Sequence, residues 1–83
     1  MELMPKYNFV IIAYDDDFEQ YRVVWAKQAW SHDNAWTLFE IEAASLPDEY
    51  SRHVGQKLIM IDTASLSVSH AYLRQGTTTE LER

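Results

Sequence analysis

The stretch "AYDDDFEQYRVVW", residues 13–25, places three consecutive aspartates and a glutamate between two apolar runs. Aspartate is a poor strand former, and its short side chain hydrogen-bonds its own backbone in turns. The five residues "DDDFE" have a normal length for the connection of a β-hairpin. The stretch therefore predicts two antiparallel strands, from which the rest of the fold can be built outward.

Both predicted strands are rich in β-branched and aromatic residues, "KYNFVIIAY" at 6–14 and "QYRVVWAKQA" at 20–29, as strands commonly are. Side chains alternate between the two faces of a strand. In the first strand, one face therefore takes Tyr7, Phe9, Ile11 and Ala13, and the other takes Asn8, Val10, Ile12 and Tyr14. In the second strand, one face takes Tyr21, Val23 and Trp25. The first two strands are thus apolar on both faces.

A helix is predicted from His32 to Ser45, with Ser31 as its N-cap and Asp33 in its first turn. Its apolar face consists of Ala35, Leu38, Phe39, Ala43 and Leu46, with Trp36 at the border. Residues 47–54, which begin with Pro47 and precede Gly55, predict a short helix or an α-turn, with a loop as the alternative.

A further strand is predicted at 56–62, where Leu58, Met60 and Asp62 share one face. Residues 63–75 are compatible with a strand or a helix. Alternation in "LSVSHAYL" favours a second hairpin that turns at Asp62–Ser65, whereas Arg74 followed by Gly76 is typical of a helix end. The tail 77–83 has little to bury and is expected to fray.

These elements predict an α+β fold with a small antiparallel or mixed sheet, in the order β-β-α-(short α)-β-β. One main amphipathic helix packs on one face of the sheet. A chain of 83 residues forms a single domain, which we place at residues 1–76.

The composition argues against several classes of function. A formal net charge of −6 argues against direct nucleic-acid binding, which needs clustered Lys and Arg. The absence of cysteine rules out disulfides, Cys-based zinc sites and thiol nucleophiles, and it suits a reducing cytoplasm. No apolar run approaches the ~20 residues of a membrane span, and the N-terminus lacks the pattern of a signal peptide. We expect a cytoplasmic protein that does not bind membranes.

No arrangement of residues predicts catalysis. Asp15–Asp17 lack the alternate spacing and the central glycine of a calcium loop. His32, His53 and His70 are dispersed, and His32 is expected to be an ordinary exposed imidazole. Serines occur without a G-x-S-x-G elbow. The sequence therefore predicts a protein that is not an enzyme, with no catalytic residues, metal ligands or cofactor.

The acidity is concentrated in one stretch, which suggests a binding surface. Residues 15–49 hold nine acids against two bases, a net charge of −7. Such a surface can occupy the basic groove of a nucleic-acid-binding protein, or it can serve solubility alone. The predicted partner-binding residues are Asp15, Asp16, Asp17, Glu19, Glu40, Glu42, Asp48 and Glu49.

In size, charge and sheet-plus-helix shape, the chain resembles the small acidic inhibitors of phages and mobile elements, among them the anti-CRISPR proteins. The resemblance rests on no motif, so it assigns a role to no residue. It implies a protein partner with a basic surface.

The apolar sheet gives an alternative function. One helix covers one face of a sheet, so the second apolar face needs another cover. Either the short helix and the chain ends supply it, or this face binds a partner or a second copy of the chain. In the latter case the protein is a homodimeric structural or adaptor module, with Tyr14, Trp25 and Trp30 at the interface.

Overall fold

The computed structural model describes residues 8–73 and 79–82. The elements in chain order are β1 (Phe9–Asp15), β2 (Gln20–Lys27), α1 (His32–Ser45), α2 (Pro47–Tyr50), the 3-10 turn η1 (Ser51–His53), β3 (Lys57–Asp62), β4 (Val68–Leu73) and β5 (Thr79–Glu82). The predicted α+β class and the order β-β-α-(short α)-β-β are confirmed, with one further strand at the end.

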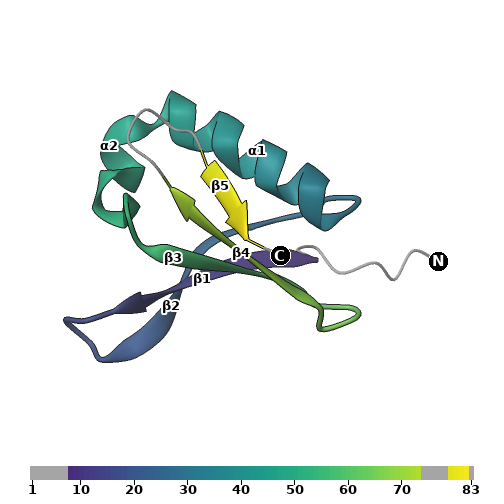
Figure 1. The fold of residues 1–83 in the computed structure, drawn as a ribbon, viewed down its shortest axis with the longest axis horizontal. Helices are drawn as coiled ribbons and strands as arrows, with labels where there is room; N and C mark the ends of the chain where they lie inside the picture. Colours follow the sequence, from purple (N-terminus) through teal and green to yellow (C-terminus); the bar gives the residue numbers. More distant parts are fainter. Residues whose placement is uncertain (1–7, 74–78, 83) are drawn as a thin grey trace.

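The strands form one five-stranded sheet in the order β2-β1-β3-β4-β5, and every neighbouring pair is antiparallel. The helices lie on one side of this sheet (Figure 1). β1 is flanked by β2 and β3, as expected of a strand that is apolar on both faces.

The first hairpin forms as predicted, with the aspartates in its turn. The Asp15 Oδ1 atom accepts a hydrogen bond of 2.9 Å from the backbone N–H of Asp17, which is the local bond that favours Asp in turns. Glu19 has a φ of 53°, so the chain passes through the left-handed region just before β2 begins. The turn therefore lies where it was predicted, and an aspartate side chain bonds to its backbone as expected.

A β-bulge in β2 changes the faces predicted for that strand. Ile11 pairs with Trp25, but the next residue, Ile12, pairs with Val23, so Val24 is an extra residue in β2. An extra residue reverses the alternation beyond it. Tyr21 and Val23 consequently face one side of the sheet, whereas Trp25 faces the side that carries α1. The prediction that these three residues share a face is wrong for this reason.

Helix α1 has the predicted bounds and the predicted N-cap. The Ser31 hydroxyl accepts a bond of 3.1 Å from the Asn34 N–H, and the Asn34 side chain accepts one of 3.0 Å from the Trp30 N–H. The buried face consists of Ala35, Trp36, Phe39 and Ala43. Trp36, predicted at the border, is 1% exposed, while Leu38 and Leu46 are 36% and 43% exposed. Compared with the predicted orientation, α1 is thus rotated about its axis so that Trp36, its largest side chain, faces the core.

The segment between α1 and β3, for which the sequence left a short helix or a loop open, is helical. α2 is a single helical turn, and η1 follows it directly. Gly55 has a φ of 83°, a left-handed conformation that glycine adopts without steric cost. Tyr50, 7% exposed, connects this segment to the core.

The second hairpin is confirmed, so the helical alternative for residues 63–75 is wrong where the structure describes them. β3 pairs with β4 from Lys57–Tyr72 to Ile61–Val68. The turn is closed by the Leu66 N–H, which donates to the Asp62 carbonyl at 2.7 Å. Leu66 has a φ of 63°, so it belongs to the turn rather than to the strand.

The tail prediction differs from the structure. Residues 79–82 form β5, which pairs with β4 through Leu73–Thr79 to His70–Glu82. A paired strand replaces the frayed end expected there. Residues 77, 78 and 83 lie outside the described residues.

The core lies between α1 and one face of the sheet. Phe39 is fully buried, and its ring meets those of Trp25, Trp36 and Tyr50 edge-to-face at centroid distances of 6.0, 6.1 and 5.4 Å. Such edge-to-face pairs add to the stabilisation from burial. From the sheet, the core takes Phe9, Ile11, Ala13, Leu58, Met60, Ala71 and Leu73.

Candidate protein-binding surfaces

The second face of the sheet carries a group of apolar side chains outside the core. No element of residues 8–73 or 79–82 covers it, because α1 and α2 both lie on the opposite side (Figure 1). Strand register and the alternation of burial assign its apolar residues: Val10, Ile12, Tyr14, Tyr21, Val23, Ala26, Ile59, Ile61, Val68 and Tyr72. We call this surface the open face.

Aliphatic side chains occupy the middle of the open face, and tyrosines occupy one end. Ile59 pairs with Ile12 on one side and His70 on the other. At the tyrosine end, the rings of Tyr14 and Tyr21 meet edge-to-face at 5.3 Å.

Charged groups on the open face are few. Within β1–β4, Lys57, which pairs with Tyr72, and half-buried His70 are the ionisable residues that the register places there besides the tyrosines. At the β5 edge of the sheet, the register pairs Glu80 with Tyr72 and Glu82 with His70. A shallow hollow of about 230 Å³ at the tyrosine end is lined in part by Tyr14, Lys57, Ile59 and Asp16. Asp16 and Lys57 therefore give this end of the face a rim with both signs of charge.

The three aromatic residues predicted for an apolar interface are not brought together. Tyr14 lies on the open face and is 43% exposed, whereas Trp25 is 4% exposed in the core. The bulge in β2 turned Trp25 inward, so its assignment to an interface is wrong. Trp30 is 92% exposed, but it lies beyond the end of β2, in the connection to α1.

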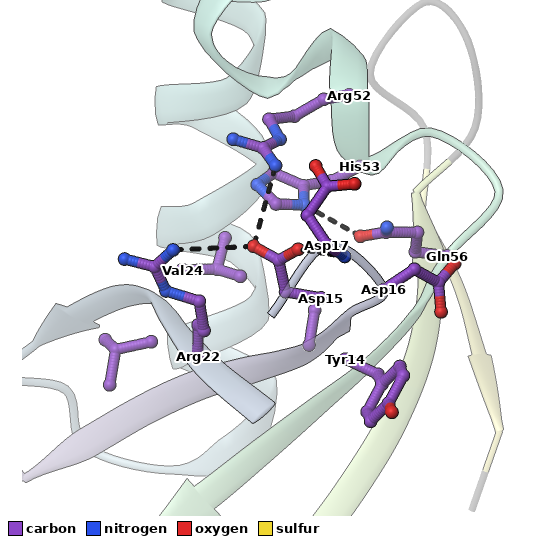
Figure 2. A pocket seen from close by; sticks show the side chains of 11 residues that line it. Tyr14, Asp15, Asp16, Asp17, Arg22, Val24, Arg52, His53 and Gln56 are labelled. Carbon is purple, nitrogen blue, oxygen red and sulfur yellow. Dashed lines mark hydrogen bonds and ion pairs between the residues drawn. The ribbon is translucent and has the colours of Figure 1, made fainter. Parts of the chain in front are cut away.

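The predicted acidic residues separate into two groups, and the first group is held by bases of the chain itself. The Asp15 Oδ2 atom lies 3.5 Å from Arg22 Nη1 and 3.7 Å from Arg52 Nη2 (Figure 2). Its side chain is 12% exposed, against 51% and 64% for the two arginines. Asp15 thus joins the first hairpin to η1. It borders a pocket of about 400 Å³ that His53 and Gln56 also line.

Glu42 belongs to the same group. Its Oε2 atom accepts a hydrogen bond of 2.7 Å from the Tyr50 hydroxyl, and its Oε1 atom lies 3.7 Å from Lys27 Nζ. Burial, followed by this hydrogen bond and the nearby carboxylates, raises the pKa of Tyr50 well above its ordinary value. Glu42 therefore acts inside the fold. Glu40 is half-buried on α1.

The second group is exposed and lies toward one end of the molecule. Asp16, Asp17 and Glu19 are at the hairpin tip, and Asp48 and Glu49 are on α2. The Arg52–Asp15 ion pair connects the hairpin to η1, which directly follows α2. The hairpin tip and α2 lie toward the same end in Figure 1. We call these five residues the acidic end. The sequence predicted the exposure of these five but not the internal roles of Asp15 and Glu42.

A polar cluster at the start of α1 was not predicted. The two ring nitrogens of His32 lie 2.9 Å from the Ser67 hydroxyl and 2.7 Å from the Ser69 hydroxyl. The buried Trp36 Nε1–H donates to Ser69 at 2.9 Å. The expectation of an ordinary exposed imidazole at His32 is therefore wrong. Nothing in the sequence pattern pairs residues so far apart, because the register of the second hairpin brings them together.

The cluster anchors the N-terminus of α1 to the second hairpin. The His32 ring also packs edge-to-face on Phe9 at a centroid distance of 5.3 Å. In the neighbouring turn, Asp62 Oδ1 accepts from the Ala64 N–H at 2.9 Å. This bond lowers the pKa of Asp62; burial opposes it, and hydrogen bonds from Ser65 and the charge of His32 add to the lowering.

Within the described part of the chain, no group of three or more His, Asp or Glu side chains is arranged to hold a metal ion.

We expect Asp15→Asn to lower the free energy of unfolding by about 1 kcal/mol, since both arginines are half exposed and solvent screens them. The asparagine keeps the Oδ1 acceptor for Asp17 but loses the charge. Urea unfolding at 0.05 M and 1 M NaCl measures the difference, which should shrink at high salt. Asp17→Asn is the matched control and should change stability little. Equal effects of the two substitutions would contradict the assigned role of Asp15.

Asp62 should make the stability of the fold depend on acidic pH. Its pKa is lower in the folded protein than the roughly 3.9 of an unfolded chain. Its contribution is therefore complete above that unfolded value and is lost as pH falls through the folded pKa. Asp62→Asn keeps an oxygen acceptor but cannot titrate. The gap in unfolding free energy between wild type and variant should be largest above pH ~5 and should narrow toward pH ~2. A gap that stays constant with pH would show that the charge of Asp62 does not stabilise the turn.

No helix in the described ranges is long and apolar enough to cross a membrane. Comparisons with protein-family models, with curated proteins and with solved structures found no match to this chain.

Proposed function

We propose that the protein is a non-enzymatic protein-binding module that docks an apolar protein surface on its open face. The observation that carries the proposal is a sheet face of β-branched and aromatic side chains that no element of residues 8–73 or 79–82 covers. Tyr14, Tyr21, Val23 and Val68 are each 43–66% exposed there. Contiguous apolar surface of this kind marks an interaction site, whereas scattered apolar residues do not.

The chemistry of the open face suits protein binding better than catalysis. Interface cores are poor in charge and rich in aromatic residues, with a polar rim. The open face has this composition, with Lys57 and Asp16 at its tyrosine end. The exposed side chains stand on paired strands, so a partner would meet them already ordered and at little entropic cost.

Photo-crosslinking tests this function. With benzoylphenylalanine in place of Tyr14, in cells that express the protein, we expect a covalent adduct with another polypeptide chain. The same probe at Ile41, which is 59% exposed on α1, is the control and should give none. Mass spectrometry of the adducts reads out the result. No adduct from Tyr14, or equal adducts from both positions, would contradict the proposed function.

A second candidate function rests on the acidic end. The basic neighbours Arg22 and Arg52 are paired with Asp15, which leaves Asp16, Asp17 and Glu19 exposed beside them. In this alternative the chain inhibits a nucleic-acid-binding protein, in the manner of an anti-CRISPR protein, by occupying its basic surface. Complementary charge would steer the two proteins together.

Neutralising the hairpin tip tests the inhibitor alternative. The triple variant Asp16→Asn, Asp17→Asn, Glu19→Gln should bind an arginine-rich peptide about tenfold more weakly in fluorescence anisotropy at low salt. Asp15 is left unchanged because it holds the two arginines. The control Thr37→Lys, Ala44→Lys, Ser45→Lys changes the net charge equally at exposed positions of α1. Equal weakening by both triples would show that only total charge matters.

A further inference from the structure

We infer that the partner on the open face is a second copy of this chain, so that the protein is a homodimer with two sheets packed face to face. This inference rests on the proposed function and names the partner. Four properties of the described residues support it: the area of the face, the absence of acids from its β1–β4 part, its aliphatic middle and the size of the chain.

The area of the open face suits a stable dimer. Five strands about 4.8 Å apart and about six residues long, at roughly 3.3 Å per residue, cover about 480 Å² in projection. The relief of the side chains makes the accessible area larger than the projection. It therefore approaches the ~800 Å² per partner that a standard interface buries.

The distribution of charge permits two copies to meet despite a net charge of −6 each. Asp48 and Glu49 are on α2, and Glu42 is on α1, both across the sheet from the open face. Asp16 alone among the predicted acidic residues lines the hollow at the rim. Repulsion between the remote acids is screened over about 8–10 Å in physiological salt. Glu80 and Glu82 pair with Tyr72 and His70 from β5, the edge strand of the sheet. A face-to-face dimer centred on β1 and β3 would therefore leave these acids at its rim.

The aliphatic middle of the face favours a copy of itself over a polar partner. The cores of homodimer interfaces are more apolar than those of transient complexes, and Ile12, Ile59 and Ile61 lie together in this middle. Two such sheets pack about 10 Å apart with their strands within about 30° of each other. In a twofold arrangement the same residues supply both sides of the interface.

The small size of the chain makes dimerisation energetically favourable, because a second sheet packed on the open face would enlarge the core. A domain of 83 residues buries a smaller fraction of its surface than a larger one, and oligomerisation is a common way to add core. The one helix layer of the described residues leaves the open face without a cover. Dimerisation would bury it without any further sequence.

The test is the mass of the protein in solution. We expect sedimentation equilibrium between 1 and about 100 µM to give twice the 9.7-kDa chain mass. Val23→Glu should weaken the dimer about 100-fold or more, because it buries an unpaired carboxylate. Ile41→Glu is the control, since Val23 and Ile41 are 66% and 59% exposed. It should leave the dimer unchanged.

Circular dichroism and urea unfolding of each variant show whether the fold persists. Both substitutions sit at largely exposed positions, so both chains should fold; Tyr14→Glu gives a second disruption at the other end of the open face. A wild-type mass of one chain over the whole range would overturn the homodimer, as would a dimer that Val23→Glu and Tyr14→Glu leave intact. In that case, a Tyr14 crosslink to a different protein would still support protein binding at the open face. The absence of a Tyr14 crosslink to any chain would contradict both the homodimer and the proposed protein-binding function.

Discussion

The packing of one helix against one face of the sheet is the constraint on which the rest of this structure depends. Phe39 of α1 reaches Trp25 of β2, Trp36 of its own helix and Tyr50 of α2. A helix is about 10 Å across, whereas five strands span about 24 Å. Large aromatic side chains fill the space between so narrow a helix and so wide a sheet, which explains why they carry the core.

The same constraint determines where polar chemistry can lie. Side chains on the helix side either enter the core or bond to one another, as Glu42 does with Tyr50 and Lys27. The His32–Ser67–Ser69 cluster fixes the other end of α1 to the second hairpin. These contacts hold the helix at both ends. Glu42 and His32 therefore stabilise the fold, as Asp15 does through its two arginines. Each of these side chains has a chemistry that could serve catalysis or binding elsewhere.

The open face is the other consequence of a two-layer structure. A sheet that is apolar on both faces needs two covers, and the described chain supplies one. The two proposed binding surfaces differ in position. Asp48 and Glu49 of the acidic end lie on α2, across the sheet from the open face, whereas Asp16, Asp17 and Glu19 lie at the hairpin tip. Asp16 also borders the hollow at the tyrosine end of the open face. Association through the open face would therefore leave Asp48 and Glu49 accessible to solvent.

Several elements could be predicted because their causes are local. Asp15–Asp17 form a turn, Ser31 caps α1, and alternation in 68–73 gives a strand, since each depends on neighbouring backbone and side-chain contacts. The presence of a second apolar face was also visible in β1. The residues of the second apolar face were harder to predict from the sequence, because one extra residue in β2 moved Trp25 into the core.

The sequence by itself determined the elements as far as β4, their order and the surplus of apolar strand surface, because propensity, capping and alternation act over a few residues. Only the tertiary structure decided which acids are free and which are paired. Arg52 and Asp15 are 37 residues apart in the chain and 3.7 Å apart in space. Such contacts follow from the strand register and from the placement of η1 beside the hairpin. The aspartates of residues 15–17 thus share a turn but differ in role, since Asp15 alone points at the two arginines.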